Sequence, residues 1–184
     1  YSWLLLFSIG ITKGKSGTLL AELFRFKELY DEDAELEEIL PDLVKQYPDE
    51  YSEMTIQQLC KRMHAFLREY RLVEGMLSCF RILPRQAMTP AQAYRGMVRG
   101  EVERVGIRSL ENRTVAVQVV PYPPGIPIIM PGEMITAETR HIIDYLCAVE
   151  ELETMFPGFE GEIHGVHRVR DDEGVNRFLL YCLK

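Results

Sequence analysis

The chain has 184 residues, of which 47% are hydrophobic and 27% charged, a composition that excludes disordered, collagen-like and low-complexity proteins. Its net charge of −7 argues against binding to duplex nucleic acid or to an anionic membrane, because both favour a basic surface. The cysteines lie far apart among apolar neighbours, without the spacing of a zinc site, so we interpret them as reduced core thiols of a cytoplasmic protein. They are Cys60, Cys79, Cys147 and Cys182.

The first third of the chain predicts a strand, a helix and a linker. Residues 2–11 form an apolar run without a basic leader, which favours a buried strand over a signal peptide. The chain starts at Tyr1 inside this run, so we expect a fragment of a longer protein. Residues 16–30 predict a helix with a broad apolar face. The acidic run 31–38 is interpreted as a solvated linker at a domain boundary.

The middle of the chain predicts short helices. Pro41 and Pro48 break the first part into short pieces. Residues 55–58 and 89–92 each read as a capping box, in which a Thr and a Gln three residues later satisfy the free amides at a helix start. A further short helix is expected over residues 75–83.

The last part of the chain changes to β-rich sequence around one strong helix. Strands are predicted over 101–107 and 114–120, a helix over 136–156, and a hairpin of strands 162–169 and 175–183. The fold class is therefore α+β: a helical segment followed by a small, mostly antiparallel sheet with a long packed helix. The residues expected to face inward on that helix are Ile142, Ile143, Leu146, Val149, Leu152 and Met155.

Few residues carry catalytic patterns, and we predict no catalytic, cofactor-binding or metal-binding residue. Residues 14–16, Gly-Lys-Ser, resemble a phosphate loop, but its first glycine is one residue out of place, which favours an ordinary helix start. His164 and His167 are three apart on an expected strand, so they point to opposite faces and share no metal ion. His64 and His141 lie on amphipathic helices and are interpreted as surface or packed residues.

Residues 121–133 hold five of the ten prolines, together with Ile126, Ile128, Ile129 and Met130. Two Pro-Gly pairs predict two tight turns around a short extended piece. Two interpretations stay open: a rigid crossover in the core, or a stiff wall that positions Tyr122 or Glu133 at a polar site.

This segment, Pro-Tyr-Pro-Pro-Gly-Ile-Pro-Ile-Ile-Met-Pro-Gly-Glu, resembles the hallmark of the bacterial ornithine/lysine/arginine decarboxylases of fold type I, which depend on pyridoxal phosphate. Further similar stretches flank it in the family's order and extend the resemblance over essentially the whole chain. They are residues 5–10 with 12–15, residues 46–49, residues 88–90, and residues 156–160 with 163–165.

The resemblance implies an organisation and an activity. Residues 1–34 would be the end of the α/β small subdomain of the catalytic, aminotransferase-like region, and residues 35–184 the C-terminal domain. The family's cofactor lysine stands in a Ser-x-His-Lys context that none of the six lysines here has. Pyridoxal 5'-phosphate would thus be bound by the full-length parent and not by this fragment, which we expect to be inactive alone.

The parent would convert L-lysine or L-arginine, with ornithine less favoured, to the amine and CO₂, in polyamine metabolism or acid stress. Implied partners are the rest of the parent, a homodimer or higher homo-oligomer, and the basic amino acid. The alternative is a non-catalytic assembly or regulatory domain.

The resemblance also bears on individual residues. Tyr122 and Glu133 become candidates for the substrate entrance, although Glu133 would equally suit the cap of the helix expected near Thr136. Some lysine-type relatives bind guanosine tetraphosphate with arginines that correspond by motif position to Glu35 and Thr55. Because neither residue is cationic, we expect no such site here.

Overall fold

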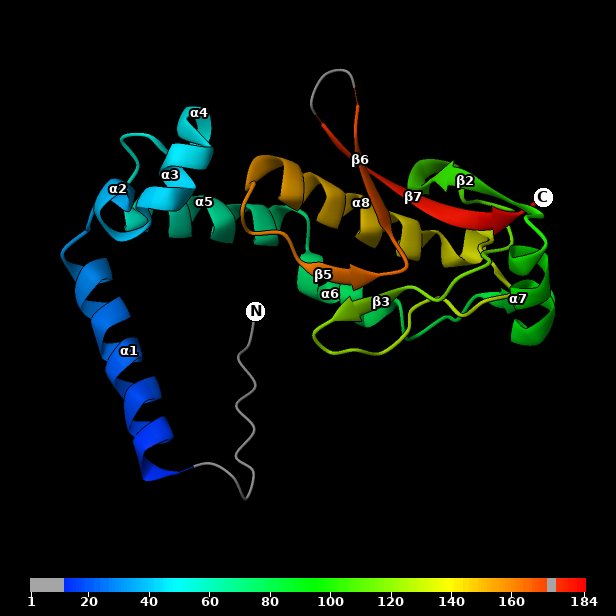
Figure 1. Cartoon of the computed structure of the whole chain (residues 1–184), viewed down its shortest axis with the longest axis horizontal. Helices are drawn as coiled ribbons and strands as arrows, with labels where there is room; N and C mark the ends of the chain where they lie inside the picture. The colour runs from blue at the N-terminus through cyan, green and yellow to red at the C-terminus, as the bar shows by residue number, and fades with distance from the viewer. Residues whose placement is uncertain (1–11, 172–174) are drawn as a thin grey trace. The chain divides into compact units, whose positions relative to one another are not determined.

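The computed structural model describes residues 12–171 and 175–184 (Figure 1). It confirms the α+β class, with helices and small antiparallel sheets. The chain divides into two compact units, Tyr1–Phe66 and Leu67–Lys184. The strand predicted over residues 2–11 lies outside the described residues. Within the described ranges, no helix is both long and apolar enough to cross a bilayer.

The first unit is helical and its helix starts follow the sequence signals. Thr12 precedes the first helix and its hydroxyl accepts a hydrogen bond from the Lys15 amide at 3.3 Å, so residues 14–16 are the helix start that the sequence favours. Pro41 and Pro48 each occupy the first turn of a short helix. The elements are α1 (Lys13–Asp31), α2 (Leu36–Ile39), α3 (Pro41–Gln46), α4 (Pro48–Tyr51) and most of α5 (Ile56–Glu69).

The prediction of a solvated linker over residues 31–38 is right for the acidic side chains, which are exposed, but wrong for Leu36 and for the backbone, which fold into the first unit. Leu36 is fully buried and its amide donates to the Met54 carbonyl at 2.9 Å. The amide of Ile56 donates to the Ala34 carbonyl, also at 2.9 Å. The acidic run therefore folds against the segment before α5, because one apolar side chain inside it has a core to enter.

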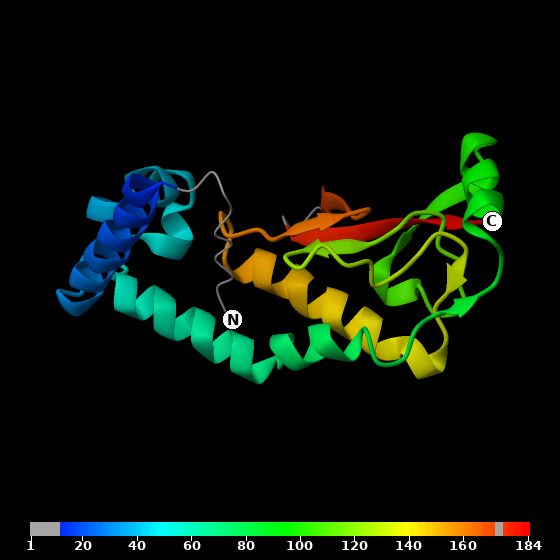
Figure 2. The same cartoon turned by 90° about the horizontal axis from the view of Figure 1, so that it is seen from below.

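The second unit is built around one long helix. Figure 2 shows α8 (Arg140–Met155) with α6 (Leu72–Ser78) on one side and β7 (Asn176–Leu183) on the other. Antiparallel pairing joins β2-β7-β6, β1-β4 and β3-β5 into three separate sheets, where the sequence predicts one. The other elements are β1 (Arg85–Gln86), α7 (Pro90–Val98), β2 (Val102–Gly106), η1 (Ile107–Ser109), β3 (Val120–Tyr122), β4 (Glu133–Met134), η2 (Ala137–Thr139), β5 (Glu162–His164) and β6 (His167–Arg170).

Two predicted strands differ in the structure: residues 114–119 form no strand, and residues 162–169 form two short strands in place of one. Residues 114–119 make only single bridges to three different segments, although Val115 and Val119 are buried in the core, and Val120 begins the next strand, β3. The strand predicted over 162–169 is divided at Gly165, whose φ is +86°. A Cβ there would lie 1.9 Å from the Gln118 carbonyl oxygen, so only glycine allows this close approach. The hairpin of β6 and β7 is confirmed.

The helix ends also differ in detail. The capping box at Thr89 and Gln92 is confirmed, and the helix that it starts ends just before Gly100, as expected. The helix predicted over 75–83 is α6, which begins three residues earlier and ends at Ser78. The helix predicted over 136–156 begins as the 3₁₀ turn η2 and continues as α8.

The inward face of α8 is partly as predicted. The five aliphatic residues from Ile142 to Leu152 are buried, but Met155 is 40% exposed, because it lies in the last turn of α8. Two residues that the sequence does not mark as inward, Glu150 and Glu153, are 2% and 0% exposed. Buried carboxylates require partners, and both have arginine partners.

Arg168 on β6 holds Glu153 by a two-bonded fork, with both N–H···O distances at 2.8 Å. The same guanidinium donates to the Gly161 carbonyl at 2.6 Å and lies 5.2 Å from the centre of the Phe178 ring. The hydrogen bond to Glu153 raises the pKa of Arg168. One guanidinium thus joins α8, the segment before β5, and the two strands of the hairpin.

Glu150 connects the same helix to η1 and β7. One carboxylate oxygen accepts from Arg108, and this hydrogen bond raises the pKa of Arg108. The other oxygen accepts from the Phe178 amide at 2.5 Å. Arg177 approaches the first oxygen at 3.8 Å. Glu150 therefore satisfies a backbone amide in the interior as well as pairing with charge.

We predict that Glu153→Gln lowers the free energy of unfolding by about 2–3 kcal/mol, because it replaces a fully buried carboxylate with a neutral group beside the Arg168 guanidinium, whose side chain is 32% exposed. Asp144→Asn on the same helix is the control, since its pair with Arg140 is exposed and should change stability by less than about 0.5 kcal/mol. Urea unfolding of both variants measures the difference, and equal effects would contradict the prediction.

Candidate functional site

The first turn of the proline segment presents Tyr122. The Gly125 amide donates to the Pro121 carbonyl at 2.8 Å and closes a five-residue turn, within which the Tyr122–Pro123 and Pro123–Pro124 peptide bonds are cis. Gly125 has φ +78°, and a Cβ there would lie 3.0 Å from the Tyr122 ring. The ring therefore rests against the turn, and the residue is 58% exposed.

The second turn is held by Glu133. The Glu133 amide donates to the Met130 carbonyl at 3.1 Å around Pro131 and Gly132, the arrangement of a type II turn. The Glu133 carboxylate accepts from the Met130 amide at 2.7 Å and so closes the turn a second time. The two predicted turns are confirmed, and the role of the carboxylate within its own turn is a detail that the sequence does not show.

Between the turns the segment is part of the core. Ile128 and Ile129 are buried. The Val119 amide donates a hydrogen bond to the Ile129 carbonyl, and the Ile128 amide donates one to the Val119 carbonyl, both at 2.9 Å. Ile126 and Met130 are exposed. The interpretation as a core crossover is therefore right for the centre of the segment, whereas a stiff wall that positions Tyr122 or Glu133 at a polar site stays a prediction.

The structure also decides how the following helix is capped. Glu133 does not cap it, because it lies in β4 opposite Gln86. Thr136 is the cap, and its amide donates to the Thr139 hydroxyl at 2.9 Å. Tyr122 and Glu133 lie in different sheets, and no hydrogen bond joins them in the described chain. A role of either side chain at a substrate entrance stays a prediction.

We predict that Gly132→Ala destabilises the chain by about 2 kcal/mol or more, because φ is +86° and the new Cβ would meet the Met88 carbonyl oxygen at 2.4 Å. The matched control is Gly161→Ala, since a Cβ there has no neighbour within 4 Å. Thermal unfolding compares the two. A Gly132→Ala chain as stable as Gly161→Ala would show that the turn is not held as described.

The histidines do not form a metal site in the described ranges, where no group of three or more His, Cys, Asp or Glu is placed to hold an ion. His164 pairs with Glu162 at 3.0 Å, and His167 packs edge-on against the Tyr181 ring at 4.7 Å between centres. His64 is exposed, as its interpretation as a surface residue predicts.

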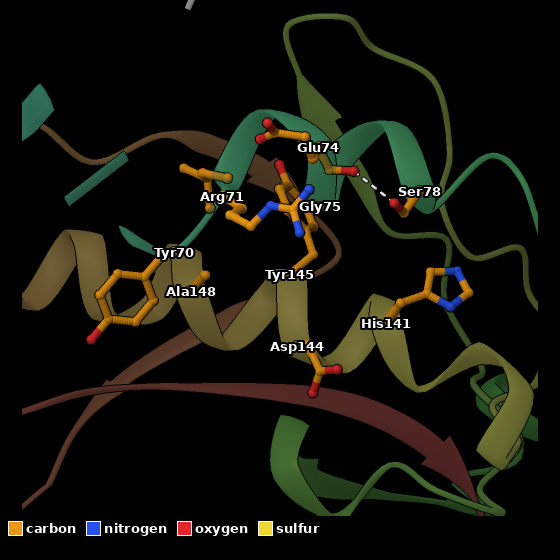
Figure 3. Close-up of a pocket in the computed structure, with 10 residues that line it drawn as sticks. Tyr70, Arg71, Glu74, Gly75, Ser78, His141, Asp144, Tyr145 and Ala148 are labelled. Carbon is orange, nitrogen blue, oxygen red and sulfur yellow. Dashed lines mark hydrogen bonds between the residues drawn. The ribbon is translucent and has the colours of Figure 1, made fainter. Parts of the chain in front are cut away.

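His141 is half-buried and lines an open pocket of about 240 Å³ between α6 and α8 (Figure 3). Its Nε2 is buried and has no hydrogen-bond partner. Arg71, Glu74 and Asp144 also line the pocket, so it carries charges of both signs. A Cβ at Gly75 would meet the Tyr145 ring at 3.6 Å, an ordinary contact, so the packing of α6 on α8 does not require glycine there. No sequence motif marks this pocket, and it includes neither Tyr122 nor Glu133.

The four cysteines are free. Cys79 and Cys182 are buried in the core as predicted, and burial raises the pKa of their thiols to about 12 and about 11. Cys60 and Cys147 are half-buried, and burial again raises their pKa values. Such thiols are poor nucleophiles at neutral pH, so none is a candidate for covalent catalysis.

The lysines do not fit a covalent pyridoxal phosphate site. All six are exposed, whereas a Schiff-base lysine is held in a cavity that desolvates its amine. They are Lys13, Lys15, Lys27, Lys45, Lys61 and Lys184.

Comparison with known proteins identifies the fold. The model of the Orn/Lys/Arg decarboxylase C-terminal domain matches residues 73–184. Lysine decarboxylase LdcA of Pseudomonas aeruginosa is 44% identical over all 184 residues, which are 24% of its length. The solved structure of lysine decarboxylase A from that organism matches the whole chain with a TM-score of 0.90 at 43% identity, again over 24% of its length.

Decarboxylases named for other substrates are also similar. The biodegradative arginine decarboxylase of Escherichia coli is 40% identical over 160 residues, 87% of this chain and 21% of its own length. The constitutive ornithine decarboxylase of the same organism is 35% identical over 172 residues, which are 92% of this chain and 24% of its own length.

The fold is thus that of the C-terminal part of basic amino-acid decarboxylases, in which a long helix packs on antiparallel strands beside a proline-stiffened loop. The chain belongs to the Orn/Lys/Arg decarboxylase family, as its sequence predicts. It spans about a quarter of the length of the relatives it matches. The boundary between residues 34 and 35 concerns the domains of the parent and stays a prediction.

Proposed function

We propose that the chain is the C-terminal part of a cytoplasmic, pyridoxal-phosphate-dependent decarboxylase that converts L-lysine or L-arginine to the corresponding amine and CO₂. The observation that supports this most is the 44% identity to a lysine decarboxylase across every residue of the chain. The cofactor, when bound by the rest of the enzyme, supplies the electron sink for loss of CO₂. The relatives described above are all enzymes, which gives the alternative of a non-catalytic module no support.

Within such an enzyme this chain would serve as support and as part of the substrate path. Its core fixes the proline segment through backbone bonds, and the two turns hold Tyr122 and Glu133 in set positions. An anionic side chain at the mouth of an active site favours approach of a cationic substrate. The full-length protein would work as a homodimer or higher homo-oligomer.

Lysine is the first substrate to assay. Identities to lysine decarboxylases and to the arginine enzyme overlap, while ornithine enzymes are less similar. The similar solved structures are lysine decarboxylases, with TM-scores of 0.85 to 0.90.

The test of the proposal is CO₂ release by the full-length protein and by the 184-residue chain, each incubated with pyridoxal phosphate and lysine, arginine or ornithine. We expect turnover of lysine or arginine by the full-length protein only. Turnover by the chain alone would contradict the assignment of the cofactor to the rest of the enzyme. No turnover of any of the three by the full-length protein would contradict the proposed function.

We predict that Glu133→Gln in the full-length enzyme raises KM for the preferred basic amino acid by roughly 3–10-fold with little change in stability. Glutamine keeps an oxygen that can accept from the Met130 amide, so the turn is retained and only the charge is lost. Tyr122→Ala should also impair kinetics, whereas His64→Gln is the exposed control.

Glu133→Ala completes the test, because it removes the hydrogen bond as well as the charge. Steady-state kinetics and thermal unfolding are measured on every variant. If the Gln variant keeps wild-type kinetics and only the Ala variant loses stability, Glu133 supports the turn and does not act on substrate.

We predict that the full-length enzyme binds no guanosine tetraphosphate through this chain. Glu35 and Thr55 lie opposite each other in an antiparallel bridge, so a carboxylate stands where cationic donors would be needed. The Thr55 hydroxyl already accepts from the Gln58 amide at 3.3 Å in the predicted capping box. Isothermal titration should show no binding attributable to this region. Micromolar binding that disappears on mutation within residues 31–55 would contradict the prediction.

A further inference from the structure

Three cationic side chains line a second pocket, of about 290 Å³, where α7 lies beside the end of β7 (Figure 1). They are Arg95, Arg99 and Lys184. Within residues 12–171 and 175–184, none of these side chains forms an ion pair or a hydrogen bond. The chain as a whole carries a net charge of −7, so three neighbouring cations without a carboxylate partner do not follow from a general excess of basic residues.

The register of α7 places both arginines on the flank that borders the end of β7. Arg95 and Arg99 are one helical turn apart, so roughly 5–6 Å separates their Cβ atoms. Gly96 lies between them and is buried, and a Cβ there would lie 2.6 Å from the Leu183 Cδ2. Glycine thus leaves room for the Leu183 side chain against the helix. Like charges at this spacing repel each other, and an anion bound between them removes that repulsion.

The arginines are not required as caps of α7. Gly100 ends the helix with φ +72°, and its amide donates to the Met97 carbonyl at 3.1 Å. The Glu101 amide donates to the Gly96 carbonyl at 2.9 Å. These two bonds form a Schellman motif, in which backbone amides satisfy carbonyls at the end of the helix. The guanidinium groups therefore keep their donors for another acceptor.

The same turn brings the third cation to the pocket. The Lys184 amide donates to the Glu101 carbonyl at 3.1 Å, which fixes the residue after β7 beside the end of α7. Glu101 also lines the pocket, so its charged side chains sum to +2, three cations less one carboxylate. Gln92 adds a neutral donor. Its side-chain oxygen accepts from the Thr89 amide and hydroxyl, both at 2.8 Å, which leaves its NH₂ group for a ligand.

We propose that this pocket binds a phosphate group, as inorganic phosphate or as a small phosphate monoester. A phosphate monoester presents three acceptor oxygens, so cations from α7 and from the end of β7 can each engage a different one, whereas a carboxylate presents two. Guanidinium forks match phosphate oxygens in a two-bonded geometry, and a dianion balances the net charge of the pocket. The volume of about 290 Å³ lies at the lower end of the roughly 300–1,000 Å³ of ligand pockets, which suits a small ligand.

The test is isothermal titration of the full-length protein with inorganic phosphate at constant ionic strength, after removal of free pyridoxal phosphate. Wild type is compared with Arg95→Gln/Arg99→Gln. The matched control is Arg81→Gln/Arg85→Gln, which removes two exposed arginines at the same spacing outside the pocket. Wild type and control should bind with a Kd of about 1 mM or lower, and the pocket variant at least about tenfold more weakly.

Two results of this titration would overturn the proposal. One is a wild-type protein that binds no phosphate. The other is an equal affinity in the wild type and the pocket variant, or an equal loss in the control, because either would mean that phosphate associates with the protein outside this pocket.

Two further probes distinguish the source and the class of the ligand. Glycerol 3-phosphate that binds more tightly than inorganic phosphate would identify an esterified ligand, and the reverse order would identify the free anion. Both orders support a phosphate site. Malonate is a dianion with two carboxylates, and if it binds as tightly as either phosphate, the assignment to phosphate is overturned.

Hydrogen exchange of the wild-type protein supplies a measurement that needs no variant. Saturating phosphate should slow exchange of the amides of residues 96–101 and 182–184 by at least about threefold and leave those of α5 unchanged. Unchanged exchange at the end of α7 would overturn the proposal. None of these measurements requires turnover, so a full-length protein that binds phosphate here but releases no CO₂ from lysine or arginine would retain the site and lose only the enzymatic proposal.

Discussion

The second unit depends on two carboxylates that a single helix carries into the core. Glu153 receives the guanidinium fork of Arg168, and Glu150 receives Arg108 and the Phe178 amide. A buried carboxylate without partners costs several kcal/mol, so α8 is stable in the core only when β6, β7 and η1 are in register around it. Apolar side chains would tolerate a shifted helix, whereas a two-bonded fork specifies one position.

The proline segment is positioned indirectly by the same contacts, through the strands that they hold. Arg168 also donates to the Gly161 carbonyl just before β5, and β5 pairs with β3, which contains Tyr122. On the other side, the Gly132 amide donates to the Val115 carbonyl at 2.8 Å, and Val115 bridges to β7. Both turns are therefore tied to the strands that the carboxylates on α8 align. A loop held in this way positions side chains at low entropic cost, which any role in substrate approach would require.

Local signals in the sequence predict much of this fold. Thr55, Thr89 and the prolines mark helix starts because capping and a fixed φ act over three or four residues, and the two Pro-Gly pairs mark turns for the same reason. What the sequence does not show is pairing over long range. Glu150 and Glu153 look like solvent-facing residues until arginines 15 to 42 residues away are brought beside them. Gly165 divides a strand only because the Gln118 carbonyl approaches it.

In the candidate site, too, local patterns in the sequence mark the residues but do not show their contacts. The repeated prolines distinguish residues 121–133 from the rest of the chain. The family resemblance likewise depends on residues that are close together in the sequence. The function of Glu133 within its turn depends on the Met130 amide, whose direction is set only once the turn has formed. On α1 the local helical pattern is also correct, but Leu20, Phe24 and Phe26 stay exposed within the described residues. In the second unit both buried carboxylates, Glu150 and Glu153, pair with arginines of the same chain. The large apolar side chains of α1 have no such burial in the described structure, so a local helical pattern does not by itself show which face of the helix is covered.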